Sequence, residues 1–358
     1  YSAFIGTTLP TSIDLYGTSA NTNFTAADIY GGAWYDLTGS SALLYPSIQN
    51  AENADLATTL YIGEGTYAED VIFSGGSNLT TITGHGTTCE LATGKQVTLE
   101  KNYTFSGFSA PQVLLNNNNA KMADALDIVK TNGNIKIADT YNISDYATVN
   151  KKVTIDKQSG TATYSGKLTI TASGVTVTNL ALTGNPAITL NLTNGCDDPI
   201  TISNNAFTLA NGGDGILVEV GNANSAGTSS LNITGNSFTS GDTSSKAIHF
   251  RNQTTGFANF TAVNVYDGNT FNTPGYNFYK TQENNICTYL PSVDVKNTTD
   301  NTYTTTNISG FYLNPAAATI STSTESLVTD CTPPAAFTTG SVTPVGGNVV
   351  SGYFNSTN

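Results

Sequence analysis

The chain has 358 residues, a formal net charge of −13 and charged side chains at only 11% of its positions. Nucleic-acid binding needs a basic stripe that displaces counterions from phosphates, and a chain whose single arginine is Arg251 has none. No apolar run reaches the roughly 18 residues of a membrane-spanning helix, so no membrane span is predicted. Self-association, or contacts with cell surfaces, glycans or cations, fit this composition better.

Residues 1–46 are predicted to form an N-terminal β segment. They include "YSAFIG" at residues 1–6 and "GGAWYDL" at 31–37, which are aromatic-rich pieces typical of short strands. The only methionine is Met122 and the chain starts at Tyr1, so we expect that a secretion signal was removed, the alternative being an arbitrary boundary. We expect "YSAFIG" to act as an assembly strand that completes a sheet of a neighbouring molecule.

Residues 47–120 are predicted to form a short first β-helix segment. "YIGEGTYAEDVIF" at 61–73 and "LTTITGHG" at 79–86 alternate β-formers with polar residues and end in turn residues. A similar start returns later, because "ADTY" at 138–141 resembles "EGTY" at 64–67. The chain therefore has either two β-helix starts or one solenoid with an internal duplication. We favour two segments joined by an exposed loop at 116–119.

Residues 121–274 are predicted to form the main parallel β-helix. "KMADALDIVKT" at 121–131 has apolar residues at helical spacing, and a helix over 122–130 would cap the open end of this segment. Further on, "ISNNAF" at 202–207 recurs as "ITGNSF" at 233–238 and "YDGNTF" at 266–271, with a weaker copy, "VTNLAL", at 177–182.

Repetition at this period is typical of a solenoid in which each turn stacks on the next. We expect the Asn to lie at a corner, bonded to neighbouring backbone in a left-handed conformation, and the Phe to point inward and stack on its counterpart. The fold class predicted is all-β, a right-handed parallel β-helix solenoid with additional β regions at both ends. An antiparallel sandwich with coincidental triplets is the alternative.

Residues 153–185 resemble the opening coils of right-handed parallel β-helix proteins of the pectin lyase-like superfamily, and residues 61–86 resemble a pectinesterase-type start. The resemblance covers roughly residues 47 to 272. It implies a polysaccharide-degrading activity, which would require the catalytic residues of one of the enzyme types on this fold.

Hydrolysis of a sugar chain needs carboxylates on either side of the scissile bond. Asp197 and Asp198, in "NGCDDPI", are the adjacent acidic pair available in the main coils. His85 lies in a "GHG" match to the polygalacturonase-type motif, but it precedes the Asp pair, whereas in those enzymes it follows. We therefore interpret His85 as a coil-corner residue.

Esterase-type catalysis needs two Asp and an Arg, and lyase-type elimination needs a basic residue with calcium-binding carboxylates. His249 and Arg251 lie two apart in "AIHFRN" and so share one face of a strand. With Asp214 or Asp198 they form the best enzymatic cluster that the sequence offers. The alternative is a surface pair without chemistry.

No cofactor is predicted except for Ca²⁺, which Asp197 and Asp198 could bind together with loop carbonyl groups, because hard oxygen ligands suit this ion. Glu69 and Asp70 are interpreted as part of a solvated turn.

Residues 275–358 are predicted to form a separate Thr-rich β region. The chain has four cysteines and no C-x-x-C pair, which disfavours zinc clusters and thioredoxin-type chemistry. We expect Cys287 and Cys331 to form a disulfide in this region, whereas Cys89 and Cys196 are either a second bridge or two buried thiols.

The sequence contains eleven Asn-x-Ser/Thr sequons, a number that chance alone would produce in so Asn-, Ser- and Thr-rich a chain. The candidate glycosylation sites are Asn23, Asn78, Asn102, Asn142, Asn191, Asn232, Asn252, Asn259, Asn297, Asn307 and Asn355.

These features favour a secreted or cell-surface, non-catalytic β-helix protein that serves as a structural subunit of a filament or surface layer, or as an adhesin. The alternatives are a polysaccharide-active enzyme (lyase, hydrolase or esterase) that uses Asp197, Asp198, His249 and Arg251, or a carbohydrate-binding protein on the same fold.

Overall fold

The computed structural model describes residues 13–16, 32–37, 41–74, 76–192, 195–220, 227–252, 260, 262–266 and 268–280, with short strands at 293–295, 302–303, 308–309, 325–327 and 352–353. The chain divides into two compact units, Tyr1–Ile143 and Ser144–Asn358. The predicted assembly strand at 1–6 and the Cys287 and Cys331 pair lie outside the described residues. No helix among the described residues is long and apolar enough to cross a membrane.

The first unit contains two larger sheets and one strand pair. One sheet has the order β1 (Ile13–Tyr16), β3 (Ser41–Tyr45), β2 (Ala33–Leu37), β4 (Thr59–Ile62), β7 (Thr81–Gly84) and β10 (Thr104–Ser106). Its first four strands pair antiparallel and the rest parallel. The other parallel pairings join β6 (Val71–Phe73), β9 (Gln96–Leu99), β11 (Ala110–Leu115) and β12 (Val129–Ile137), and separately β5 (Gly65–Tyr67) and β8 (Cys89–Leu91). Strand β13 (Asn142–Ile143) ends the unit.

Two short helices pack on these strands. Helix α1 (Ile48–Ala54) starts at the N-cap Ser47, and the Glu69 carboxylate accepts hydrogen bonds from the backbone N–H groups of Ile48 and Gln49 at 2.9 and 3.2 Å. Glu69 thus satisfies N–H groups that every helix start leaves open, and so has a structural role beyond the predicted solvated turn.

Helix α2 (Met122–Ile128) starts where the apolar spacing predicts a helix, but it ends two residues early. Val129 already belongs to β12, where it pairs with Ala110 of β11. A β-branched residue beside a ready strand edge favours the sheet over a further helical residue.

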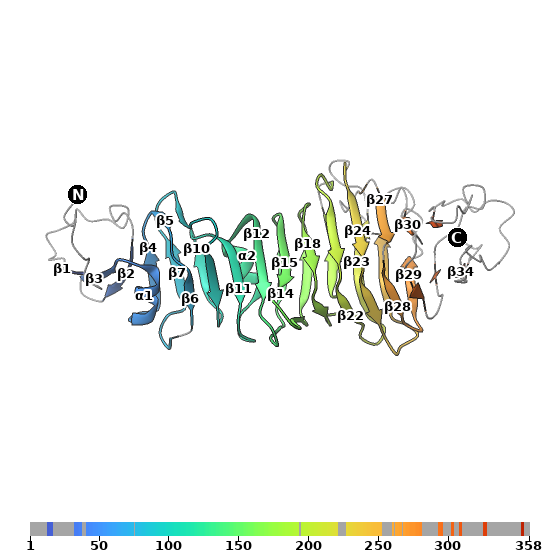
Figure 1. Cartoon of the computed structure of the whole chain (residues 1–358), viewed down its shortest axis with the longest axis horizontal. Helices are drawn as coiled ribbons and strands as arrows, with labels where there is room; N and C mark the ends of the chain where they lie inside the picture. The colour runs from blue at the N-terminus through green and yellow to red at the C-terminus, as the bar shows by residue number, and fades with distance from the viewer. Residues whose placement is uncertain are drawn as a thin grey trace. The chain divides into compact units, whose positions relative to one another are not determined.

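The second unit consists of three sheets whose strands alternate along the chain (Figure 1). The first sheet contains β15 (Val153–Lys157), β18 (Thr176–Thr178), β21 (Ile200–Ser203), β24 (Ser230–Thr234), β27 (Ala262–Tyr266), β30 (Val293–Val295) and β33 (Glu325–Leu327). The second contains β16 (Thr163–Tyr164), β19 (Ala181–Leu182), β22 (Ala206–Thr208), β25 (Ser237–Thr239), β28 (Thr270–Asn272) and β31 (Thr302–Tyr303). The third contains β14 (Tyr146–Val149), β17 (Lys167–Ile170), β20 (Ile188–Leu190), β23 (Asp214–Val220), β26 (Lys246–Asn252), β29 (Tyr276–Lys280), β32 (Ile308–Ser309) and β34 (Gly352–Tyr353).

From β14 to β29, each strand pairs in parallel with the strand three places later in the chain. We call three consecutive strands, one from each sheet, a rung; β21, β22 and β23 form one rung. The chain is thus mostly β with long parallel sheets, and this order is compatible with a parallel β-helix. Parallel pairing throughout these rungs does not fit the antiparallel-sandwich alternative.

A ladder of buried asparagines connects the repeated motifs. The Asn236 side-chain amide donates to the Ile202 carbonyl at 2.8 Å and to Asn269 Oδ1 at 3.2 Å, while Asn236 Oδ1 accepts from the Asn205 backbone N–H at 2.9 Å. Asn205 and Asn269 bond in the same way to Val177 and Ile233. Each Asn therefore satisfies backbone groups of the preceding rung that would otherwise be buried without a partner.

The left-handed conformation predicted for the corner Asn is found one residue earlier. The residues directly before the ladder position have positive φ angles: Asn179 (59°), Asn204 (55°), Gly235 (64°) and Gly268 (87°). Asn and Gly tolerate this conformation better than other residues. The bend and the hydrogen-bonded ladder are therefore performed by two neighbouring residues, and the prediction that one Asn does both is wrong.

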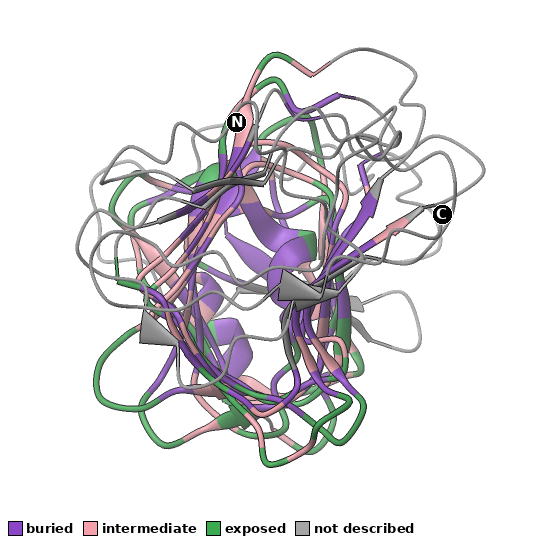
Figure 2. Cartoon of the chain, turned by 90° about the vertical axis from the view of Figure 1, so that its right-hand side faces the viewer, coloured by how far each residue is buried: buried purple, intermediate pink, exposed green. Residues whose placement is uncertain are grey.

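The predicted column of inward-pointing phenylalanines is confirmed. Phe207 and Phe238 stack with ring centroids 4.6 Å apart, and Phe238 and Phe271 with centroids 5.0 Å apart, at interplanar angles of 13° and 7°. All three are fully buried. Figure 2 shows that buried residues lie along the inner side of the strands, whereas exposed residues gather at the turns.

We predict that Asn236→Ala lowers the free energy of unfolding by about 2–4 kcal/mol, because it leaves the Asn205 N–H and the Ile202 carbonyl without partners. Urea unfolding followed by circular dichroism measures the change. The matched control is Asn232→Ala, on the half-exposed face of β24, which should cost less than about 1 kcal/mol. An equal loss in both variants would contradict a special role for the ladder.

Candidate functional site

The strongest cluster of ionisable side chains in the second unit lies on β23 and β26, neighbouring strands of the third sheet. Ile216 and Val218 of β23 are in register with Ile248 and Phe250 of β26, and all four are buried in the core. Because side chains alternate along a strand, His249 and Arg251 are placed on the opposite, outer face, as the sequence predicts.

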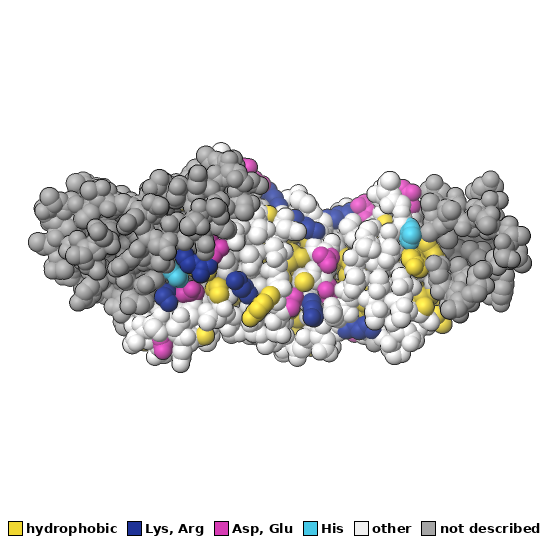
Figure 3. All heavy atoms as spheres, turned by 180° about the vertical axis from the view of Figure 1, so that it is seen from behind, with side chains coloured by type: hydrophobic (Ala, Val, Ile, Leu, Met, Phe, Trp, Pro, Cys, Tyr) yellow, Lys and Arg dark blue, Asp and Glu magenta, His cyan; other side chains and the backbone are white. Residues whose placement is uncertain are grey.

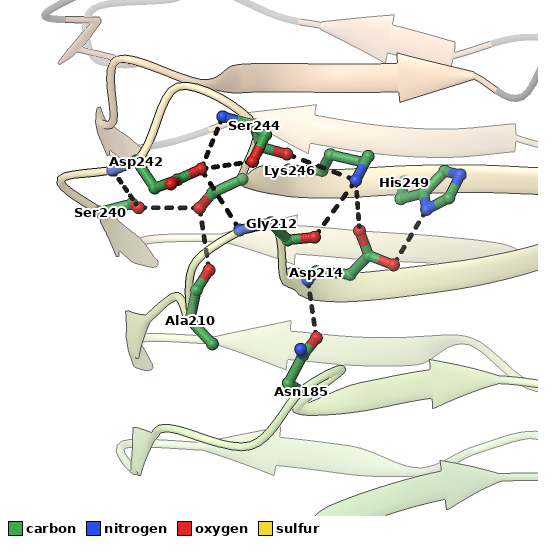
Figure 4. A network of polar contacts seen from close by, with 10 residues as sticks. Asn185, Ala210, Gly212, Asp214, Ser240, Asp242, Ser244, Lys246 and His249 are labelled. Atoms are coloured by element: carbon green, nitrogen blue, oxygen red, sulfur yellow. Dashed lines mark hydrogen bonds and ion pairs between the residues drawn. The ribbon is translucent and has the colours of Figure 1, made fainter.

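Asp214 is the centre of this cluster (Figure 4). Its Oδ2 lies 3.0 Å from His249 Nδ1 and its Oδ1 lies 3.6 Å from Lys246 Nζ. The side chains are largely buried, with 17% of Asp214, 10% of His249 and 19% of Lys246 exposed. The backbone N–H of Asp214 donates to Asn185 Oδ1 at 3.1 Å, which fixes the carboxylate relative to the preceding rung. We call Asp214, Lys246 and His249 the Asp214 cluster.

A turn stabilised by Asp242 lies before β26. Asp242 Oδ1 accepts hydrogen bonds from the Ser244 hydroxyl, from the Ser244 N–H at 2.7 Å and from the Gly212 N–H at 3.3 Å. These bonds, led by the one from the Ser244 hydroxyl, lower the pKa of the Asp242 carboxyl below its ordinary value. The carbonyls of Gly212 and Ser244 both lie 3.4 Å from Lys246 Nζ, so the turn orients the lysine toward Asp214.

Arg251 does not join the Asp214 cluster. Its guanidinium pairs with Glu219, the residue opposite it in β23, and 42% of the Arg251 side chain is exposed against 7% for Glu219. His249 and Arg251 therefore share a face but have separate carboxylate partners. An Arg–carboxylate pair of this kind holds two strands together.

Asp197 and Asp198 lie in the segment before β21, and Asp198 pairs with a lysine outside the Asp214 cluster. Asp198 Oδ2 lies 3.1 Å from Lys152 Nζ, and the Asp198 carbonyl accepts from Gly174 N–H and from Cys196 Sγ. The four-residue group expected from the sequence is thus divided among different partners. Among the described residues no group of three or more His, Cys, Asp or Glu side chains is placed to hold a metal ion. Calcium at Asp197 and Asp198 stays a prediction, and Lys152 would compete with it for Asp198.

In the first unit, His85 packs among aromatic rings. Its ring centroid lies 5.4 Å from that of Trp34 and 5.1 Å from that of Tyr61, and its backbone N–H donates to the Ile62 carbonyl at 2.8 Å. Of the described carboxylates, none forms an ion pair or hydrogen bond with the His85 side chain. These contacts agree with the corner interpretation of the "GHG" stretch.

The two described cysteines are buried thiols rather than a disulfide. Cys196 Sγ donates to the Asp198 carbonyl at 2.9 Å, and Cys89 Sγ lies 3.6 Å from the Ile62 carbonyl. Burial raises the pKa of both thiols from 9.0 to about 12. Both are therefore protonated and unreactive in the folded chain.

Lys246 is the functional residue of the cluster that the sequence interpretation missed. A signal for it exists, because Asp214 and Lys246 both stand two residues before the first inward isoleucine of their strands, Ile216 and Ile248. Aligning "GGDGI" at 212–216 with "SSKAI" at 244–248 places the two opposite charges side by side.

The chemistry available at the Asp214 cluster is limited. A carboxylate bonded to Nδ1 of an imidazole orients the ring and stabilises its charged form, which is how general bases are held in hydrolases. The cluster lacks a second carboxylate for acid–base cleavage of a sugar bond. Most of the described surface in Figure 3 carries neither charged nor hydrophobic side chains.

The chain was compared with known proteins, and no protein-family model, no curated protein and no solved structure matches it.

We predict that Cys89 and Cys196 resist alkylation in the folded chain and react only as it unfolds, because only the thiolate attacks. Their folded pKa lies above the ordinary value of 9.0, so the stability contribution of the neutral thiols is complete below pH 9 and is lost as the pH approaches about 12. Iodoacetamide labelling with peptide mapping, with and without urea, measures the reactivity of the two thiols. Rapid labelling at pH 8 without urea would contradict burial of the thiols.

Proposed function

We propose that the chain is a right-handed parallel β-helix of the pectin lyase-like type, secreted or at the cell surface. In this proposal it has no catalytic role and serves as a structural subunit of a filament or surface layer, or as an adhesin. The observation that carries the proposal is the repeated rung, in which parallel pairing, the Asn ladder and the Phe column continue in register from one rung to the next.

A repeated rung suits a load-bearing role. In repeat proteins stability is a sum over neighbouring units, so each rung adds backbone bonds and buried side chains of the same kind. The side chains between rungs here are amides and aromatic rings, whose contacts are insensitive to salt and to pH near neutrality. A scaffold of this kind tolerates extracellular conditions that weaken surface ion pairs.

The state of the ionisable residues supports a role without catalysis. Two carboxylates that were candidates to act on a substrate have a lysine partner, Lys152 for Asp198 and Lys246 for Asp214, and the candidate Arg251 is paired with Glu219. Catalytic acids and bases are recognised instead by groups poised to change charge.

Assembly would have to overcome mutual repulsion between copies of net charge −13. Strand addition at a sheet edge does this with backbone hydrogen bonds rather than charge. In the first unit β1 is the outermost strand of its sheet, and the candidate assembly strand at residues 1–6 precedes it in the chain. Divalent cations would assist by reducing the repulsion.

We predict that deleting residues 1–8 abolishes assembly while the circular dichroism spectrum stays unchanged, because the donor strand lies outside the rungs. Negative-stain electron microscopy and light scattering, with and without Ca²⁺, measure this. The matched control replaces residues 1–8 by a Gly/Ser segment of equal length, which should also fail to assemble. Ordered filaments or sheets from either variant would discard the strand-addition route, and dispersed monomers of the intact chain would weaken the structural role.

One observation favours a second candidate, a polysaccharide-active enzyme. The Asp214–His249 contact at 3.0 Å lies on the outer face of the third sheet, beside the exposed Arg251. An oriented imidazole next to a guanidinium can remove a proton from a sugar ring or activate water, while the guanidinium attracts a carboxylate-bearing substrate.

If this second candidate is right, a panel of neutral and uronic glycans will yield reducing ends or unsaturated products, and His249→Ala will lower the rate at least about 100-fold by removing the general base. The control variant is Asp242→Asn, which changes a carboxylate near the cluster without touching His249. Absence of any product across the panel, or equal rates in both variants, would reject the enzyme.

A further inference from the structure

In the first unit, four turns between strands are stacked on one another. Backbone hydrogen bonds connect them in order: Glu100 N–H to the Phe73 carbonyl at 3.0 Å, Asn116 N–H to the Leu99 carbonyl at 2.9 Å, and Ala138 N–H to the Leu115 carbonyl at 2.9 Å. The turns follow β6, β9, β11 and β12. We call them the turn stack; it comprises residues 74–80, 100–103, 116–121 and 138–141, of which Gly75 is not described.

Three sequons of the first unit begin in the turn stack or directly after it. Asn78 lies in its first turn and Asn102 in its second, whereas Asn142 follows its fourth turn as the first residue of β13. The backbone N–H of Asn142 donates to Asn118 Oδ1 at 2.7 Å, which ties the fourth turn to the third. The third turn contains four consecutive asparagines but no sequon, because none of residues 118–121 is a serine or threonine.

Each of these sequons faces outward with its full recognition element. The first and third residues are exposed and the middle residue is buried: Tyr103 between Asn102 and Thr104, and Ile143 between Asn142 and Ser144. The extended backbone places the amide and the hydroxyl on the same side of the chain. A glycan attached there would extend into solvent without displacing any core side chain.

The three sites differ in the state of the acceptor amide. The Asn78 amide donates to the Asp55 carbonyl at 2.8 Å, and its backbone N–H is held by the Asp55 carboxylate. The side-chain amides of Asn102 and Asn142 form no hydrogen bond to any described residue. Adjacent turns are only about 5 Å apart, so glycans on both Asn78 and Asn102 would collide, whereas Asn102 and Asn142 have an unmodified turn between them.

In the second unit, the sequon at Asn232 differs from those at Asn102 and Asn142, because its side chain is hydrogen-bonded. Asn232 is half-buried in the middle of the first sheet, and its Oδ1 accepts from the Asn264 amide at 2.9 Å and from the Ser230 hydroxyl at 3.2 Å. A glycan there would break a cross-strand contact. The sequons at Asn23, Asn259, Asn297, Asn307 and Asn355 lie outside the described residues.

We propose that Asn102 and Asn142 are N-glycosylation sites and that the turn stack is the glycosylated edge of the first unit. The donor would be an oligosaccharide linked to a polyprenyl diphosphate. Asn Nδ2 forms a bond to the anomeric carbon of the donor, the bond from that carbon to the diphosphate oxygen breaks, and Nδ2 loses one proton. The inference rests on the proposed secreted or cell-surface location, because such donors act on exported chains.

Mass spectrometry of the native purified material tests the proposal. Trypsin releases each site in its own peptide, residues 102–121 and 137–151, and cleavage after glutamate releases Asn78 alone in residues 70–90. The expected result is a saccharide mass addition on most copies of the two tryptic peptides and none on residues 70–90. Asn102→Gln and Asn142→Gln variants should each remove one glycan and leave the circular dichroism spectrum unchanged.

An unmodified peptide at either site in the native material would overturn the proposal, and so would equal modification of Asn78 or Asn232. Labelling of intact cells with a membrane-impermeant amine reagent separates this failure from failure of the proposed function. Lysine labelling on intact cells together with bare Asn102 and Asn142 would reject the glycosylated edge alone. Lysines that react only after lysis would reject the cell-surface location itself.

Discussion

The structure of the second unit depends on one constraint: the backbone must bend sharply between the first and second sheets of every rung without leaving buried polar groups unpaired. A left-handed residue makes the bend, and the side chain of the following Asn bonds to the rung before: its amide donates to a backbone carbonyl there and its oxygen accepts from a backbone N–H there. Because these bonds repeat at Asn205, Asn236 and Asn269, they hold the register of these rungs at the corner. The Phe column directly after it then has a single possible alignment.

Much of this arrangement could be predicted from the repeated "NxF" frame, since a polar residue and an aromatic residue at constant spacing require the same environment in every copy. The inward Phe207, Phe238 and Phe271 follow from it. The copy at 202–207 alone does not predict which residue makes the bend and which forms the ladder, because Asn204 and Asn205 stand side by side and either one could adopt the left-handed conformation. Gly235 and Gly268 in the later copies contain the deciding information, since glycine prefers that conformation and has no side chain to bond.

The partners of the side chains at the candidate site are harder to predict from the sequence than the fold. Placing His249 and Arg251 on one face needs only the alternation of a strand, but their partners depend on the register between strands 32 residues apart (from Glu219 to Arg251). A shift of one residue would exchange every outward pair for an inward one. The sequence groups Asp197 and Asp198 with His249 because they are acidic and adjacent, whereas in the structure Asp198 forms an ion pair with Lys152. Charge pairing in a parallel sheet is therefore governed by position within the rung.

The fixed corner also divides the rung into parts with different tolerance to evolutionary change. Between the first and second sheets, two residues separate β18 from β19, β21 from β22 and β24 from β25, whereas five separate β15 from β16 and three separate β27 from β28. The connections that leave the third sheet vary, with nine residues from 191 to 199 after β20 and nine from 253 to 261 after β26, but only five from 171 to 175 after β17. The longest connections of these rungs thus leave the third sheet, where new binding loops can arise or foreign peptides can be displayed without altering the register of the sheets.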